Sequence, residues 1–170
     1  MMKMSLILFL MIITSMIGNK AADTLKKRMS KLKLIMLMIS EIEIMIKYKS
    51  ATVFEIVSEL NKKNCFNELK FLKIIQTLSK NPDRGFDEMW EEAVLSENCP
   101  EYKEEDLKLI CSIGRRLGKS ELDGQLSSIA ILKAETEKLI SEADKIYAEK
   151  GKMYRYLGVL SGAFISIIII

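Results

Sequence analysis

The sequence predicts an all-α protein, because residues that form helices dominate it and residues that end them are scarce. Leucine, isoleucine, methionine, lysine and glutamate recur throughout, whereas the 170 residues include only 2 prolines and 8 glycines. Apolar residues repeat every three or four positions, and the alternating pattern of a strand is missing. We expect a bundle of about five to six helices, in which the long first and last helices continue into transmembrane helices.

An uncharged apolar segment near the start of the chain predicts a membrane anchor. Residues 4–18 read MSLILFLMIITSMIG, and a spanning helix needs about 17 to 25 residues. Because Lys3 can reach the interface at one end and the residues after Gly18 extend the other, we expect a transmembrane anchor over residues 4–20. A cleaved signal peptide is the alternative, although the sequence around Lys20 lacks the small-residue pattern of a cleavage site.

The first helix is expected to continue beyond this anchor, because apolar residues recur in steps of four and three. The stripe consists of Leu25, Met29, Leu32, Met36, Ile39 and Ile46. Such a stripe is the core-facing side of a helix. Lys26, Lys27 and Arg28 follow the anchor directly. Two roles are open for these residues: contact with anionic lipid headgroups, and setting the orientation of the anchor. The two roles are compatible.

Four shorter helices are expected next. They cover residues 52–63, the segment from Phe66 to just before Pro82, the segment from Asp87 to just before Pro100, and residues 104–117. Thr52 and Glu55 have the spacing of a capping box, and Asp87 is expected to cap its own helix. Three acidic residues at 104–106 suit the positive end of the helix dipole.

The last helix is predicted from about Leu122 to Ile170, a length on the order of 70 Å. An apolar seam with alternating steps of three and four runs from Ile129 to Leu160 without a break. A seam of this length needs a partner face. The stripe of the first helix supplies one within the chain, and a second copy in a coiled coil is the alternative.

The final residues predict a second membrane anchor, over residues 156–170. They include four consecutive isoleucines, and Tyr154, Arg155 and Tyr156 have the character of an aromatic and cationic interface anchor. A terminal helix buried in the protein core is the alternative. Basic residues gather after the first anchor and before the second. The positive-inside rule therefore places residues 21–155, the expected helical domain, in the cytoplasm.

Small residues and glycines mark the candidate packing and partner surfaces. Gly158, Gly162 and Ser166 recur every four residues, which allows close helix packing in lipid, although short segments also give this spacing by coincidence. Residues 114–118 (GRRLG) lack the strand and the ending of a phosphate loop, and we expect a tight corner between helices there. The remaining candidates are Trp90, Gly114, Leu117, Gly118 and Gln125, with Trp90 expected in the core.

The composition gives no support for an enzyme. Histidine is absent, and it is the residue most used in acid–base catalysis near neutral pH and the commonest metal ligand. Cys65, Cys99 and Cys111 are too widely spaced for a zinc motif and suit free thiols. A net charge of +3 is too small to indicate a nucleic-acid partner. We expect no catalytic residue, cofactor, metal or small-molecule substrate.

Four features of the sequence resemble the stage III sporulation protein AB family of endospore-forming bacteria. They are the two-anchor plan, MWEEAV at 89–94, Ile113-Gly114-x-x-Leu117-Gly118 followed by Gln125, and LGVLSG at 157–162. Their order and spacing hold over essentially the whole chain. The chain departs from the family pattern at Lys49-Ser50-Ala51, where a Thr-Pro-Leu turn is common, and at Glu121, where the family has aspartate.

This resemblance implies a helical domain like those of the F-type platform protein of type II secretion and type IV pilus machines. It also implies a platform subunit of the multi-protein channel between mother cell and forespore, held in the mother-cell membrane around the forespore. The implied partners are the secretion-like ATPase of the same operon, other stage III channel subunits and membrane lipid. An exported or membrane-tethered helical binding or scaffold protein of unrelated function is the alternative.

Overall fold

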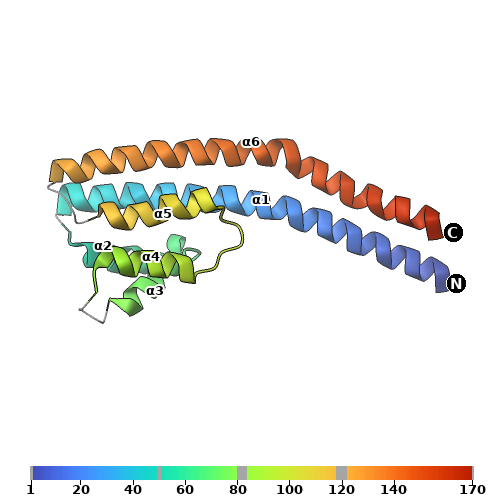
Figure 1. The fold of residues 1–170 in the computed structure, drawn as a ribbon, viewed down its shortest axis with the longest axis horizontal. Coiled ribbons are helices and arrows are strands. Elements are labelled where there is room, and N and C mark those ends of the chain that lie inside the picture. Colours follow the sequence, from blue (N-terminus) through green and yellow to red (C-terminus); the bar gives the residue numbers. More distant parts are fainter. Residues whose placement is uncertain (1, 50, 80–83, 118–121, 170) are drawn as a thin grey trace. The chain divides into compact units, whose positions relative to one another are not determined.

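The computed structural model describes residues 2–49, 51–79, 84–117 and 122–169, with side chains described from residue 9 to residue 167 except at 50, 80–83 and 118–123. These residues form six α-helices and a short 3-10 turn, without a strand among them. Figure 1 shows the helices in their order along the chain. The predicted all-α class and number of helices are confirmed. The elements are α1 (Met2–Lys49), α2 (Val53–Lys62), η1 (Asn64–Phe66), α3 (Lys70–Leu78), α4 (Phe86–Ser96), α5 (Glu104–Arg116) and α6 (Leu122–Ile169).

The chain divides into two compact units. The terminal unit consists of residues 1–30 and 141–170, and the central unit consists of residues 31–140. Helices α1 and α6 contain 48 residues each and contribute to both units. The expected continuation of the first and last helices is therefore confirmed for the described residues.

The core of the central unit is built around one face of α1. Ile35, Met38, Ile39 and Ile42 on α1 are at most 1% exposed, and they belong to one apolar cluster with residues from the five other helices. The predicted stripe is only partly right, because Met36 is half-buried while Ile35, Met38 and Ile42 lie at its side, fully buried. The run LIMLMI supplies apolar residues all around the helix, so the stripe could not be placed from spacing alone.

The predicted seam of α6 holds only in its first half. Ile129, Leu132 and Ala143 are buried, but Leu157 and Leu160 are 52% and 63% exposed. Among the described residues of the terminal unit, the buried positions other than Arg28 are instead small, and they include Gly158. The prediction of an unbroken seam is wrong, because glycines let two helix backbones approach more closely than leucines do.

Helix starts follow local hydrogen bonding. Helix α2 begins at the predicted capping box: the Glu55 N–H donates to Thr52 Oγ1 over 3.4 Å, and the Thr52 N–H donates to Glu55 Oε2 over 2.8 Å. The predicted cap at Asp87 is wrong, because Gly85 is the N-cap of α4 and Asp87 lies in the first turn. The helix expected from Phe66 begins only at Lys70, because the 3-10 turn η1 intervenes.

Replacing Thr52 with alanine is expected to destabilise the protein by about 1 kcal/mol, the usual loss for a missing N-cap. The substitution removes the acceptor of the Glu55 N–H and the hydroxyl that donates to Glu55 Oε2 over 2.9 Å. Urea denaturation followed by circular dichroism measures the change. Thr77→Ala, which removes an exposed hydroxyl bonded within its own helix, is the matched control and is expected to have a smaller effect.

Over the described part of the chain, no helix has a stretch that is both long enough and apolar enough to cross a membrane. The predicted anchors cover residues 4–20 and 156–170. The side chains of residues 4–8 and 168–170, which belong to those anchors, lie outside the described residues. The two transmembrane helices are therefore not confirmed, and membrane anchoring stays a prediction.

Candidate functional site

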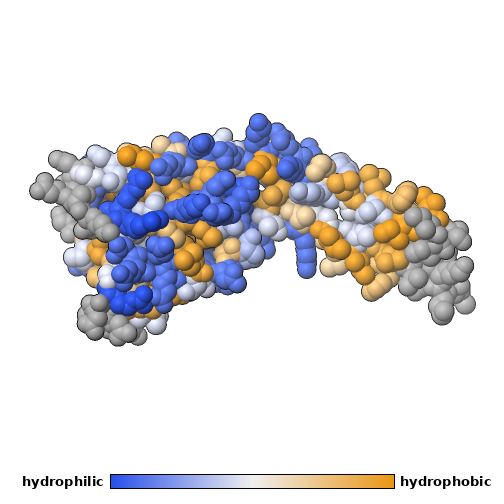
Figure 2. Space-filling view, viewed as in Figure 1, coloured by the Kyte–Doolittle hydropathy of each residue, from blue (hydrophilic) through white to orange (hydrophobic). Residues whose placement is uncertain are grey.

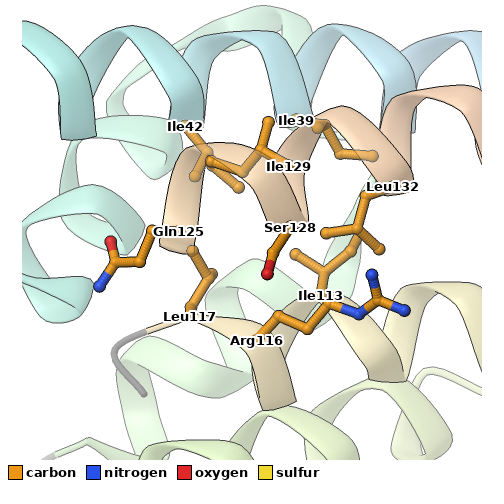
Figure 3. Close-up of a pocket in the computed structure, with 9 residues that line it drawn as sticks. All are labelled: Ile39, Ile42, Ile113, Arg116, Leu117, Gln125, Ser128, Ile129 and Leu132. Atoms are coloured by element: carbon orange, nitrogen blue, oxygen red, sulfur yellow. The ribbon is translucent and has the colours of Figure 1, made fainter. Parts of the chain in front are cut away.

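The corner where α5 is followed by α6 packs against α1 in the central unit. Figure 3 shows the residues there: Ile39, Ile42, Ile113, Arg116, Leu117, Gln125, Ser128, Ile129 and Leu132. Their cavity has a volume of about 10 Å³, which is the space of one water molecule. A ligand pocket usually measures about 300 to 1,000 Å³. The corner is thus a packed joint between helices and too small for a ligand.

The predicted corner residues lie in different environments. Leu117 is buried and ends α5 as its C-cap, while Gln125 is half-buried on α6. In Figure 3 the amide of Gln125 extends away from the apolar side chains of the cavity. Gly118, the second glycine of the predicted corner, lies outside the described residues.

Trp90 and Gly114 are in close contact in the core of the central unit. Trp90 is fully buried, and its indole N–H donates to the Ile110 carbonyl over 2.8 Å. A Cβ added at Gly114 would lie 2.5 Å from Cδ1 and 2.6 Å from Cβ of this tryptophan. Phe71 and Phe86 lie 5.5 and 5.7 Å away from the indole, measured between ring centroids. The glycine therefore leaves room for the indole ring, and the indole fixes α4 against α5.

A partly buried polar cluster, absent from the sequence-based candidates, joins α1 to the segment after α4. Lys31 Nζ donates to Cys99 Sγ over 2.8 Å, and the Cys99 thiol donates to Glu101 Oε2 over 3.0 Å. The ammonium also lies 3.7 Å from Glu97 Oε1 and 5.2 Å from the centre of the Tyr102 ring. The side chain of Lys31 is 16% exposed and that of Glu97 is 3% exposed. We name these residues the Lys31 cluster.

One signal in the sequence could have revealed this cluster. Lys31 precedes Ile35, Met38 and Ile42 by four, seven and eleven residues, so it lies on the core-facing side of α1. Proximity in the sequence alone groups it with the basic residues that follow the first predicted anchor. A lysine on a core face needs a partner because a buried unpaired charge is costly.

The Lys31 cluster changes the pKa values of its members. Burial alone lowers the pKa of Lys31, but the hydrogen bond to Cys99 and the carboxylates of Glu97 and Glu101 outweigh it, and the pKa is raised. Burial, with the hydrogen bond to Glu101, raises the pKa of Cys99. Burial, followed by the nearby charge of Glu97, strongly raises the pKa of Tyr102. At neutral pH the cluster therefore holds an ammonium, a neutral thiol and a neutral phenol.

Replacing Lys31 with methionine is expected to lower the free energy of unfolding by about 2 kcal/mol, because it leaves the buried Glu97 carboxylate without its cation. That carboxylate keeps only the Phe71 N–H, which donates to Oε2 over 3.2 Å. Lys108→Met is the matched control, since its ion pair with Glu104 is largely exposed and little change is expected. Equal losses in the two variants, measured by urea denaturation, would contradict a structural role for the cluster.

The stability of the protein is expected to fall as pH rises above about 9, the ordinary pKa of a cysteine. Raised pKa values mean that the folded state keeps protons that the unfolded state has lost. The free energy of unfolding therefore decreases through the alkaline range, and these groups leave it unchanged below that range. Tyr102→Phe removes one such group. It also removes a buried hydroxyl that has no hydrogen-bond partner among the described residues. The fall in melting temperature between pH 7 and pH 11, measured by thermal denaturation, should be smaller for this variant than for the unmodified protein.

In the terminal unit the two helix segments approach closely at glycines. A Cβ added at Gly18 would lie 2.5 Å from the Tyr154 carbonyl oxygen and 3.0 Å from Gly158 Cα. A Cβ added at Gly162 would lie 2.5 Å from Thr14 Oγ1. Ser166 is buried, and its hydroxyl donates to the Gly162 carbonyl over 2.7 Å. The small residues thus lie between the two segments.

The large apolar residues of the same unit face outward. Ile17, Leu160, Phe164 and Ile167 are 62%, 63%, 67% and 73% exposed. Figure 2 shows hydrophobic side chains gathered on the surface of the part of the molecule that carries the described ends of the chain. A hollow of about 320 Å³ lies between the two segments beside the glycines, and Ile17, Leu157 and Tyr154 line part of it.

The predicted interface residues are not all on the surface. Lys26 and Lys27 are exposed, as are Arg155 and Tyr156, while Tyr154 is half-buried. The remaining basic residue of the group, Arg28, is only 3% exposed. Its position, four residues before the buried Leu32, places it on the inner side of α1.

The described residues contain no group of three or more histidine, cysteine, aspartate or glutamate side chains that could hold a metal ion. Cys65 is exposed, Cys99 is half-buried and Cys111 is buried, and all three are free thiols. The described residues thus offer helix contacts, a buried charge cluster and exposed surfaces.

Comparison with known proteins identifies a family. The sequence model of the family described as stage III sporulation protein AB matches residues 3–170, which is essentially the whole chain. Neither a curated protein nor a solved structure matches it.

Proposed function

Because the chain belongs to the stage III sporulation protein AB family, its role is in sporulation, and we propose that it is a membrane-anchored assembly subunit of the channel between mother cell and forespore. In this proposal residues 4–20 and 156–170 are the anchors and residues 21–155 form a cytoplasmic helical domain. The subunit carries out no reaction. It holds partner proteins of the channel, including the secretion-like ATPase, at the mother-cell membrane around the forespore.

The proposal of membrane anchoring rests on the distribution of side chains in the terminal unit, which is the inverse of the distribution found in water-soluble proteins. Gly18, Gly158 and Gly162 lie between the helix segments, while Phe164 and Ile167 are about two-thirds exposed or more. In water, large apolar residues are buried and small ones tolerate the surface. In lipid, association depends on close packing of small residues, and large apolar side chains face the acyl chains. The arrangement therefore favours lipid as the solvent of this unit.

Charges beside the apolar segments support the proposed orientation. Lys20, Lys26 and Lys27 are exposed after the first segment, and Lys152 and Arg155 are exposed before the second. Cations at these positions remain on the cytoplasmic side during insertion and are attracted to anionic headgroups there. Both segments then enter the membrane from the same face.

Thiol labelling in intact protoplasts tests the orientation. In a variant whose only cysteine is Cys65, which is exposed, an impermeant maleimide is expected to react only after the membrane is opened. Both variants are produced in vegetative cells, where the far side of the membrane faces the medium, and Lys3→Cys in a background without other cysteines is the control that is expected to react in intact protoplasts. Labelling of Cys65 in intact protoplasts would reverse the orientation.

The intact mass of the purified protein separates this proposal from an exported helical binding protein. A membrane-anchored subunit keeps its first segment, so the full mass is expected. A mature chain that starts near Ala21 or Asp23 would show cleavage of a signal peptide and would favour export.

The partner part of the proposal is tested at the corner between α5 and α6. We expect Gly118→Leu to reduce co-purification of the channel ATPase from sporulating cells and to lower the yield of spores. Ser127→Ala, at an exposed position of α6, is the control. Full recruitment by a folded Gly118→Leu protein would remove the corner from the docking surface.

A further inference from the structure

The side of α1 that faces away from the core of the central unit carries an apolar stripe. Leu37, Ile44 and Tyr48 are 45%, 49% and 72% exposed, although the opposite side of the same helix supplies fully buried residues of the core. Spacings of seven and four residues place the three side chains within about 40° of each other around the helix. We call Lys33, Leu37, Ser40, Ile44, Lys47 and Tyr48 the outer face of α1.

The stripe is narrow and bordered by polar residues. Ser40 lies beside it and is half-buried, and its hydroxyl donates to the Met36 carbonyl over 3.1 Å. Helices that lie flat on a membrane have a broad apolar side, whereas the contact between two packed helices is a seam with spacings of three, four and seven. The width of the stripe therefore fits one helix better than a bilayer surface.

The charge left free along this face is positive. The two nearby carboxylates are already paired: Glu41 lies 2.6 Å from Lys63 Nζ, and Glu43 is bonded to Lys133. Lys33 and Lys47 are exposed, and within the described part of the chain neither forms an ion pair with a carboxylate. Lys47 lies over the ring of Tyr48 at 5.4 Å.

This charge disfavours a second copy of the chain as the occupant. In an antiparallel pair of outer faces Lys33 would meet Lys47 of the other copy, and in a parallel pair each lysine would meet its equivalent. Like charges placed opposite each other in an interface disfavour the pairing. A partner helix with carboxylates beside its apolar residues has no such conflict.

We propose that the outer face of α1 binds an acidic amphipathic helix of another protein. Leu37 and Ile44 pack between the apolar residues of that helix, Tyr48 covers one end, and Lys33 and Lys47 pair with its carboxylates. This surface is separate from the corner between α5 and α6. The proposal also does not depend on where the two ends of the chain lie.

Photo-crosslinking in sporulating cells tests the proposal on the full chain. A benzophenone amino acid replaces Ile44 in one variant and Leu95, which is 55% exposed on α4, in a control variant. We expect a protein adduct at position 44 and not at position 95. Mass spectrometry of the adduct should place the crosslink in a segment with apolar residues at helical spacing and a net negative charge.

Charge reversal at the two lysines provides a second test of the proposed interface. Lys33→Glu with Lys47→Glu is expected to reduce the adduct at position 44 by about tenfold, because two attractive contacts become repulsive. Lys33→Arg with Lys47→Arg keeps the charge and should retain the adduct. Circular dichroism checks that each variant is folded.

Several results would overturn the proposal. These are an absent adduct, an adduct with lipid, an adduct with a second copy of the chain, the same partner at position 95, or an adduct that charge reversal leaves unchanged. None of them bears on anchoring of the chain in the membrane, which thiol labelling and intact mass test separately.

Discussion

Gly114→Leu is expected to lower the free energy of unfolding by about 4 kcal/mol, the sum of overpacking and a lost buried hydrogen bond. Any side chain at this position meets the indole of Trp90, whose Cδ1 would lie 2.5 Å from the new Cβ. The indole is fully buried and bonded to the Ile110 carbonyl, so it cannot move without losing that bond or displacing Phe71. We therefore expect α4 to separate from α5.

The fluorescence of Trp90 measures this effect, because it is the only tryptophan of the chain. Its emission should move to longer wavelength at a lower urea concentration in the variant than in the unmodified protein. Gly85→Ala is the control, since a Cβ there meets only the flexible carboxylate of Asp87. A loss below about 1 kcal/mol for Gly114→Leu would show that the contact is looser than its geometry indicates.

Gly158→Ile is expected to separate the two segments of the terminal unit. A Cβ at this position would lie 2.8 Å from the Thr14 carbonyl oxygen and 3.1 Å from Gly18 Cα, and backbone atoms cannot move aside as side chains do. Because the segments touch through small residues, one branched side chain should widen the gap along the whole contact and cost on the order of 3 kcal/mol.

A disulfide measures that separation. A Cβ at Gly162 lies 2.5 Å from Thr14 Oγ1, so cysteines at positions 14 and 162 come within bonding reach. In a background without other cysteines, Thr14→Cys with Gly162→Cys should form an intramolecular bond, and adding Gly158→Ile should abolish it. Val159→Ile adds bulk to a half-exposed neighbour and should leave the bond intact. Equal yields with both additions would contradict pairing through the glycines.

The helix plan of this chain follows from its sequence because the signals are local. Spacing of apolar residues predicts the long helices, and the pairing of Thr52 with Glu55 predicts the start of α2. Neither needs knowledge of what lies nearby in space. The prediction of Asp87 as a helix cap is wrong because the cap position depends on backbone conformation. Gly85 already has the extended backbone of an N-cap, so no capping carboxylate is needed there.

Contacts between distant segments could not be predicted in the same way. The Lys31 cluster joins residues 68 positions apart, and only the core-facing position of Lys31 hints at it. The change from a leucine seam to a glycine contact along α6 likewise does not follow from spacing, although Gly158 and Gly162 are among the packing candidates of the sequence. Spacing identifies which residues share a face, whereas the distance between two backbones decides which face is used.

Membrane attachment of the unprocessed chain is tested most directly by fractionation of sporulating cells. The full-length protein is expected in the membrane pellet, to remain there through high salt and alkaline carbonate, and to be released only by detergent. Such behaviour distinguishes anchors within the bilayer from a charged surface held to headgroups, which salt removes. Unprocessed protein that stays in the supernatant without detergent would contradict the proposed anchors and, with them, the membrane-bound assembly role.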